Sequence, residues 1–245
     1  MTARLRGVAL RLHGPLQAWG GAAIGDDRPT LPFPTRSGVL GMVAACMGIR
    51  RDQQDRLAAL AHGTRVHVRV DVAGTPLVDD QTIQDHPRAS TTRQTIQSKR
   101  TYLCDASFAA VVLPGPEASV DAISAAIAEP VFAPFLGRRS CVPSSPLLMG
   151  APVEADDPIG LFDGLERGPV ELLRQVRRDS QDTDWYSDET AMVGSETEDF
   201  YLDVPDYPGA LRRIAVRDDF TGLLPRQWRE RFAVHVRKQA MPTRR

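Results

Sequence analysis

TRVHVRVDV, residues 64–72, alternates strictly between apolar and polar side chains. The valines fall on one face of an extended chain, and Arg65, His67, Arg69 and Asp71 fall on the other. A period of two residues is the pattern of a β-strand, and this is the clearest strand in the sequence. The segments on either side of it decide which kind of sheet it joins.

The segments before this strand predict one strand and two helices. Residues 4–12 mix apolar and basic positions and are short enough for an opening strand. After a long loop rich in glycine and proline, VLGMVAACM (39–47) predicts a buried helix that Thr35 or Ser37 can cap. We expect a second, short helix that begins with Asp52 as its cap.

The segments after it complete a familiar order of elements. Residues 75–100 begin and end strand-like and predict a protruding hairpin, and residues 101–113 predict the next core strand. An amphipathic helix is expected over 117–128 and a fourth core strand around 146–153. The first 153 residues thus predict the order βαββαβ. This is the order of an α+β, ferredoxin-like or RRM-like domain, here with a hairpin insertion.

The C-terminal region, residues 154–245, predicts a smaller and mostly β part. Residues 169–178 have a helical pattern, whereas RRIAVRD (212–218) and FAVHVRK (232–238) have strand patterns. Residues 179–206 predict an acidic loop. Their periodicity does not predict how these C-terminal segments pack together.

Charge is strongly segregated along the chain, although the net charge is only −1. Residues 1–153 carry 16 basic and 12 acidic side chains, residues 154–206 carry 4 and 16, and residues 207–245 carry 10 and 3. The average therefore does not argue against a nucleic-acid binder.

The composition also limits where the protein works and what it carries. With 42% hydrophobic residues, no run of about 18 apolar residues and no signal-peptide pattern, a soluble, cytoplasmic protein with no membrane contact is expected. Cys46, Cys104 and Cys141 are odd in number and far apart, so we interpret them as buried hydrophobic residues. The histidines lack metal-ligand spacing, and no catalytic motif is present, so no metal, cofactor or catalytic residue is expected.

Three basic features indicate an anion-binding surface. The helix start Thr35-Arg36-Ser37-Gly38 offers free backbone N–H groups, and Gly137-Arg138-Arg139 places two guanidinium groups at a turn. Residues 86–104 contain four basic side chains and no acid. Each feature alone could be a solvated surface, but together they favour a nucleic-acid backbone.

Two residue sets leave alternatives open. Trp19 lies in the glycine-rich loop and could either stack on a base or anchor the loop to the core. His86, Lys99 and Tyr102 could in principle form the acid, base and cation of a metal-independent ribonuclease across the hairpin.

Five blocks of this sequence together resemble the CasD family, the RAMP-superfamily subunits of type I-E CRISPR Cascade complexes. They cover most of residues 8–150 and part of the C-terminal region. The blocks are LRLHGPLQAWG (10–20), FPTRSGVLGMVAACMGI (33–49), TIQSKRTYLCDASF (95–108), PFLGRRSC (134–141) and LPRQW (224–228).

This resemblance implies a ferredoxin-like RAMP domain with a thumb hairpin at about residues 75–100. It implies a non-catalytic subunit that binds and caps the 5′ handle of the crRNA and helps to assemble the complex for target recognition. The implied partners are the CasC backbone subunits and the CasA large subunit, and target DNA is met only indirectly through the complex. Guide processing in this subtype belongs to CasE.

Matching the blocks residue by residue gives eight candidate RNA contacts and no catalytic or metal-binding residue. The runner-up interpretation is an endoribonuclease that processes CRISPR repeat RNA, and a third is a scaffold that contacts only protein. The candidate contacts are Gln17, Trp19, Arg36, Ser37, Lys99, Arg100, Arg138 and Arg139.

Overall fold

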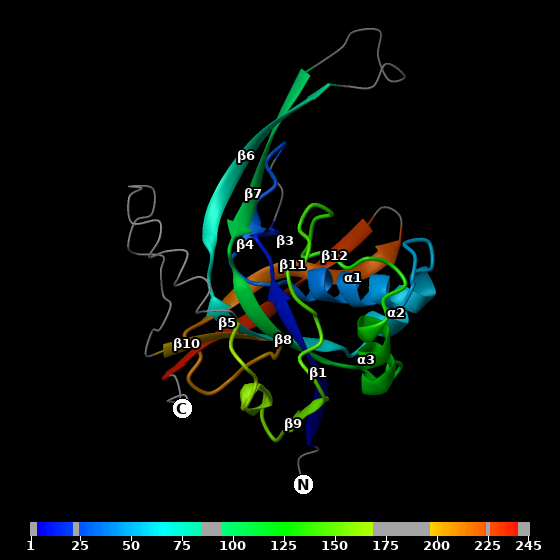
Figure 1. Cartoon of the computed structure of the whole chain (residues 1–245), viewed down its shortest axis with the longest axis vertical. Helices are drawn as coiled ribbons and strands as arrows, with labels where there is room; N and C mark the ends of the chain where they lie inside the picture. The colour runs from blue at the N-terminus through cyan, green and yellow to red at the C-terminus, as the bar shows by residue number, and fades with distance from the viewer. Residues whose placement is uncertain (1–3, 22–24, 85–94, 169–196, 224–225, 240–245) are drawn as a thin grey trace.

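The computed structural model describes residues 4–21, 25–84, 95–168, 197–223 and 226–239, and groups their strands into three sheets (Figure 1). The main sheet has seven strands in the order β11-β12-β10-β5-β8-β1-β9. These strands are β1 (Leu5–His13), β5 (Arg65–Val72), β8 (Ser107–Leu113), β9 (Val153–Ala155), β10 (Thr197–Leu202), β11 (Arg212–Leu223) and β12 (Arg226–Gln239).

The central part of the main sheet has the predicted ferredoxin-like topology. Its strands β9-β1-β8-β5 are the fourth, first, third and second of the βαββαβ order, and every pair is antiparallel. Three helices accompany these strands, and α1 packs against α2, α3 and β5. The helices are α1 (Arg36–Cys46), α2 (Gln54–Ala61) and α3 (Val120–Ala128).

Strand β8 is buried along its whole length because both faces of the sheet are covered. Phe108, Ala110 and Val112 belong to the cluster that packs beneath the helices, whereas Ala109 and Val111 belong to a second cluster on the opposite face. The second cluster includes a 3₁₀ turn, η1 (Gly160–Phe162). A strand covered on both faces becomes a continuous apolar run.

The same double cover buries the polar face of the strand first recognised in the sequence. Arg69 pairs with Asp71 at 2.7 Å and is 4% exposed. Its guanidinium also donates to the backbone carbonyls of Phe162, Leu165 and Glu166. Burying a charge is tolerated only with such partners, so this arginine fastens the covering segment to β5.

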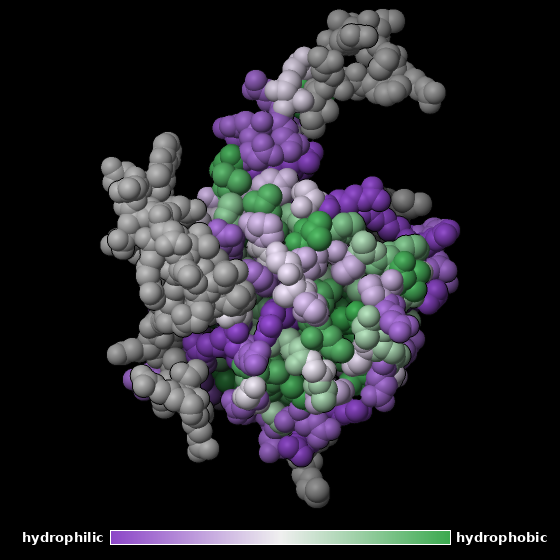
Figure 2. Space-filling model, in the orientation of Figure 1, coloured by the Kyte–Doolittle hydropathy of each residue, from purple (hydrophilic) through white to green (hydrophobic). Residues whose placement is uncertain are grey.

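A hairpin formed by β6 (Thr75–Gln84) and β7 (Thr95–Cys104) projects from the sheet as the predicted thumb (Figure 1). At its base β7 also pairs with the short strand β2 (Leu16–Gln17). Figure 2 shows a largely hydrophilic surface on the described part of this thumb. The tip, residues 85–94, lies outside the described residues.

Several local predictions are corrected. The strand expected over 101–113 is interrupted, because Asp105 has a φ of 54° between β7 and β8. The fourth core strand begins only at Val153, and its predicted position contributes a single bridge from Leu148 to β1. Helix α2 is preceded by Gln53 and not by Asp52, since it begins one residue later than expected.

The C-terminal strands extend the main sheet. Strand β10 pairs with β5 and β12, and β12 pairs with β11, which confirms the strands expected over 212–218 and 232–238. The helix predicted over 169–178 and the first part of the acidic loop, up to residue 196, lie outside the described residues. The prediction of a loop is wrong over residues 197–202, which form β10. The predicted domain boundary at residue 153 stays a prediction, and strands from both sides of it share one sheet.

Cys46 and Cys141 are buried, as expected of small apolar residues, and Cys104 is half-buried. Burial raises the pKa of all three thiols. No helix in the described part of the chain is long and apolar enough to cross a bilayer.

Candidate nucleic-acid interface

The glycine-rich loop is fastened to the core by Gln17, which is 0% exposed. Its side-chain amide donates to the carbonyl oxygens of Leu12 at 3.1 Å and Ala106 at 2.7 Å. Its side-chain oxygen accepts a hydrogen bond from Trp19 Nε1 at 2.9 Å. All of these partners are internal, so we assign Gln17 to the scaffold and not to the RNA surface.

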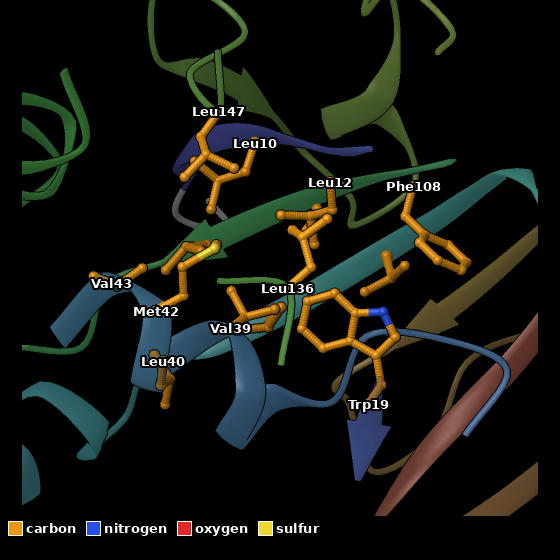
Figure 3. Packing of buried hydrophobic residues seen from close by; sticks show 14 of the residues in the cluster. Leu10, Leu12, Trp19, Val39, Leu40, Met42, Val43, Phe108, Leu136 and Leu147 are labelled. Carbon is orange, nitrogen blue, oxygen red and sulfur yellow. The ribbon is translucent and has the colours of Figure 1, made fainter. Parts of the chain in front are cut away.

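Trp19 is likewise 0% exposed, and its ring lies beside Val39 and Leu136 (Figure 3). Of the two roles left open by the sequence, the structure therefore supports the anchor and not the base-stacking platform. The ring also supports the start of α1, because a Cβ on Gly38 would lie 2.9 Å from Trp19 Cε3. A glycine is required there for the helix to approach the loop this closely.

Helix α1 begins as predicted. Thr35 is its N-cap, and Thr35 Oγ1 accepts a hydrogen bond from Gly38 N at 3.2 Å. Ser37 Oγ lies 3.5 Å from that same hydroxyl. The cap satisfies one of the free N–H groups of the first turn, so the anion site predicted there depends on the side chains around it as well.

The Gly137-Arg138-Arg139 turn is joined to the glycine-rich loop. Ala18 N donates to Leu136 O at 3.0 Å. Gly137 has a φ of +93°, and a Cβ on it would lie 1.7 Å from Ala18 O. No other residue fits this position without moving the backbone, so this glycine fixes where the two following arginines begin.

A cavity of about 790 Å³ lies between α1, α2 and the segment 132–139. Its charged lining residues are all arginines, and no acidic residue of the described chain is among them. The remaining lining is mainly apolar, so charge and apolar surface meet in one hollow, as an unstacked nucleotide requires. The four arginines are Arg36, Arg50, Arg51 and Arg139.

Arg36 is the buried member of this set, with 7% exposure. Arg36 Nε donates to Thr64 O at 2.8 Å, and Nη2 donates to Ala61 O at the end of α2. The Asp203 carboxylate lies 3.5 Å from Nε. The predicted RNA contact is therefore a cross-link between the two helices that wall the cavity.

The other cavity arginines are exposed. Arg139 was predicted from the turn motif, whereas Arg50 and Arg51 were not singled out. They follow the end of α1 by four and five residues, so their signal was an arginine pair shortly after a helix C-terminus. Arg138 and Arg139 are adjacent in sequence, but only Arg139 lines the cavity. The two arginines therefore belong to different parts of the surface.

Arg138 belongs to a second basic group at the thumb base. It donates to Thr101 O at 3.1 Å and to Arg28 O at 2.7 Å, and its guanidinium lies 4.6 Å from the Tyr102 ring centroid. Arg28 lies beside Lys99 of β7, because Arg28 N donates to Lys99 O at 2.8 Å. Here the structure gathers two of the predicted contacts with a residue that the sequence did not indicate.

Strand β6 supplies acids to this base. Asp80 is opposite Lys99, and Asp79 is opposite Arg100. Cross-strand neighbours of opposite charge reduce the local positive potential. The thumb base is therefore a weaker anion site than the acid-free cavity.

Of the three residues proposed for a ribonuclease, the structure describes Lys99 and Tyr102 and does not bring their side chains together. Lys99 and Tyr102 are three positions apart on β7, so their side chains leave opposite faces of the strand. Tyr102 is 5% exposed beneath Arg138, and His86 lies outside the described residues. Among the residues that the structure describes, no group of three His, Cys, Asp or Glu could hold a metal ion.

Comparisons with known proteins agree with the sequence blocks. A family model described as CRISPR-associated protein (Cas_Cas5) matches residues 7–239. The CRISPR system Cascade subunit CasD of Escherichia coli (strain K12) is 41% identical over 164 residues, which cover 62% of this chain and 73% of that relative. This match confirms the resemblance stated above.

Two solved structures share the fold along nearly the whole chain. A chain of a CRISPR RNA-guided surveillance complex matches with a TM-score of 0.64 and 29% identity, over 95% of this chain and 89% of its own. A structure described as a Cas protein matches with a TM-score of 0.51 and 27% identity, over 93% and 95%.

Proposed function

The chain belongs to the CRISPR-associated Cas5 family, and we propose that it holds the 5′ handle of a crRNA without cutting it. It is a CasD-like Cascade subunit of a CRISPR surveillance complex, as its similarity to CasD and to a chain of such a complex indicates. Within that complex, the handle is the part of the RNA that this subunit contacts.

The single observation that carries the proposal is the acid-free cavity lined by four arginines beside the start of α1. Phosphate binding by arginine gains from counterion release and from paired N–H donors. Arg50, Arg51 and Arg139 supply exposed charges, and Ser37 supplies a hydroxyl at the rim. Phe132, 41% exposed, offers an apolar face to a base.

The thumb base supplies a second contact. Lys99 is exposed and Arg100 is half-buried on β7, and Arg138 is held beside them by two backbone carbonyls. Since Arg138 and Arg139 are consecutive, one turn links the cavity to the thumb. RNA that leaves the cavity past this turn therefore meets the base of the hairpin.

The subunit assembles with others and breaks no bond. The CasC backbone and the CasA large subunit are its proposed neighbours, and target DNA reaches it only through the complex. Tyr102 is buried and points away from the face that carries Lys99, which supports binding without catalysis.

The test uses end-labelled CRISPR repeat RNA incubated with the purified protein in EDTA, followed by native and denaturing gels. A shifted, intact RNA is the expected result. An Arg50→Ala/Arg51→Ala variant should shift less RNA. A matched Arg4→Ala/Arg6→Ala variant, which removes two exposed arginines from outside the cavity, should bind as wild type does.

Two outcomes would contradict the proposal. A discrete cut within the repeat would establish a ribonuclease, and Lys99→Ala and Tyr102→Ala would then identify its residues. Equal binding by both double variants would show that the cavity is not the RNA site.

A further inference from the structure

The C-terminal strand β10 and the residue after it contact the chain at the start of α1. Tyr201 lies on β10, and Asp203 follows two residues later, directly after the strand ends. Residues two apart on an extended chain point the same way. Both side chains face the segment that leads into α1, in which Phe33 and Arg36 flank Pro34 and Thr35.

Tyr201 holds the first of these flanking residues by ring stacking. Its ring centroid lies 3.9 Å from that of Phe33, with an angle of 13° between the ring planes. On the other side Tyr201 stacks on His235 of β12 at 4.9 Å. Phe33 is 2% exposed and Tyr201 is 8% exposed, so the stack leaves the incoming loop little room to shift.

Asp203 contacts Arg36, the second of these flanking residues. Its Oδ2 lies 3.5 Å from Arg36 Nε and accepts a hydrogen bond from Val66 N at 3.1 Å. Its backbone N–H donates to His67 Nδ1 at 3.1 Å. The carboxylate is therefore fixed against β5 and presents a charge to a guanidinium that is itself buried.

Arg36 connects Asp203 to the walls of the cavity. Its Nε also donates to Thr64 O, and its Nη2 donates to Ala61 O, at the C-terminal end of α2, where the helix dipole favours a cation. Since α1 and α2 both line the cavity, the spacing of these two walls depends on a guanidinium that Asp203 orients.

We infer that Asp203, supported by Tyr201, is a positioning residue for RNA binding, acting through Arg36 and without touching RNA. This inference rests on the proposed function. It assigns a role to the C-terminal region, because Asp203, directly after β10, fixes the geometry of the site. The proposed RNA contacts themselves all lie in the first 140 residues.

The test separates positioning from charge by the salt dependence of RNA affinity. Asp203→Asn keeps the size of the side chain and removes its charge, and it should lower affinity for handle RNA about tenfold. The plot of log affinity against log salt should keep the wild-type slope, because no phosphate contact is lost. Affinity is measured at a temperature at which circular dichroism shows that the variant is folded.

Three further variants serve as controls for this measurement. Asp206→Asn, a matched change at an exposed position three residues on, should bind as wild type. Arg50→Ala/Arg51→Ala should lower affinity and also flatten the slope. Asp203→Glu, which restores the carboxylate on a longer side chain, should recover part of the affinity.

Wild-type affinity in a folded Asp203→Asn variant would overturn the inference and leave the proposed function intact, provided that the arginine variant still weakens binding. If Asp203→Asn does not fold, Phe33→Leu replaces it. That variant removes the stack on Tyr201 and should lower affinity about threefold with an unchanged slope. Unchanged affinity there would overturn the inference equally, and absence of RNA binding by wild type would overturn both.

Discussion

Arg36 and Arg139 line the same cavity, but their surroundings differ in every respect. Arg36 is 7% exposed and its guanidinium meets two carbonyls and a carboxylate, whereas Arg139 is exposed and forms no ion pair within the described residues. A buried guanidinium with internal partners organises the walls, and an exposed one is left for a ligand. Proximity to a site therefore does not make an arginine a ligand contact.

The largest expected effect is on the buried member of this pair. Arg36→Ala leaves Asp203 without its guanidinium and removes one donor from each of two carbonyls, so we expect a loss of about 3–5 kcal/mol in the free energy of unfolding. Urea denaturation followed by circular dichroism measures it. A loss below about 1 kcal/mol would show that Arg36 is not a cross-link.

The next effect comes from the glycine that places Arg139. Gly137→Ala introduces a Cβ at 1.7 Å from Ala18 O at a φ of +93°, and we expect a loss of about 2 kcal/mol in stability. The Gly164→Ala variant is the control, because that glycine also has a positive φ, +74°, but open space around its Cβ. Equal losses in both variants would show that backbone conformation alone, and not contact with Ala18, matters here.

Arg139→Ala should give the opposite signature to Arg36→Ala. Its stability should stay within about 0.5 kcal/mol of wild type, because an exposed side chain without an ion pair contributes little. Affinity for handle RNA, measured by fluorescence anisotropy, should fall about fivefold, as expected for the loss of a charge-assisted hydrogen bond. A stability loss as large as that of Arg36→Ala would erase the distinction between the two arginines.

Arg237 offers an intermediate case with the smallest effect. Its side chain is 44% exposed and pairs with Asp199 at 2.8 Å. Burial alone would raise the pKa of Asp199, but hydrogen bonds from Arg237 and His235 outweigh it and lower that pKa. Stability from this carboxylate is therefore present above the ordinary value of about 3.9 and is lost as the pH falls through the lowered pKa.

The matching variant is Asp199→Asn. Its melting temperature should be lower than that of wild type near pH 6, by an amount equivalent to less than about 1 kcal/mol, since a partly exposed pair contributes little. The difference between the two proteins should shrink as the pH falls below about 3.9. A difference that grows with acid would contradict the assigned pKa direction.

Local patterns predicted the fold where a period was visible. The alternation of residues 64–72 and the apolar helix after Thr35 both reappear as β5 and α1. The break at Asp105 was missed because a run such as TYLCDASFAA contains no glycine or proline, although aspartate tolerates a positive φ better than most residues. The order of the C-terminal strands depends on long-range pairing, which periodicity does not encode.

The candidate site could be predicted only in part, for a related reason. The sequence indicated the right segments, because the loop, the helix start and the turn do meet. It did not indicate which side chains face inward. Gln17 is committed to Ala106 O, 89 residues away, and Arg36 is committed to Asp203 in the C-terminal region. Contacts of that separation decide exposure, and exposure decides which arginines can meet a ligand.

The central claim, that the exposed arginines of the cavity bind RNA phosphates, is tested most directly by salt titration. Affinity for a single-stranded handle RNA is measured between 50 and 300 mM KCl, a range chosen to span physiological salt at about 150 mM, for wild type, Arg50→Ala/Arg51→Ala and Arg4→Ala/Arg6→Ala. Loss of two phosphate contacts should flatten the slope of the cavity variant by about 1.4, while the control keeps the wild-type slope. Parallel lines for wild type and the cavity variant would contradict the account.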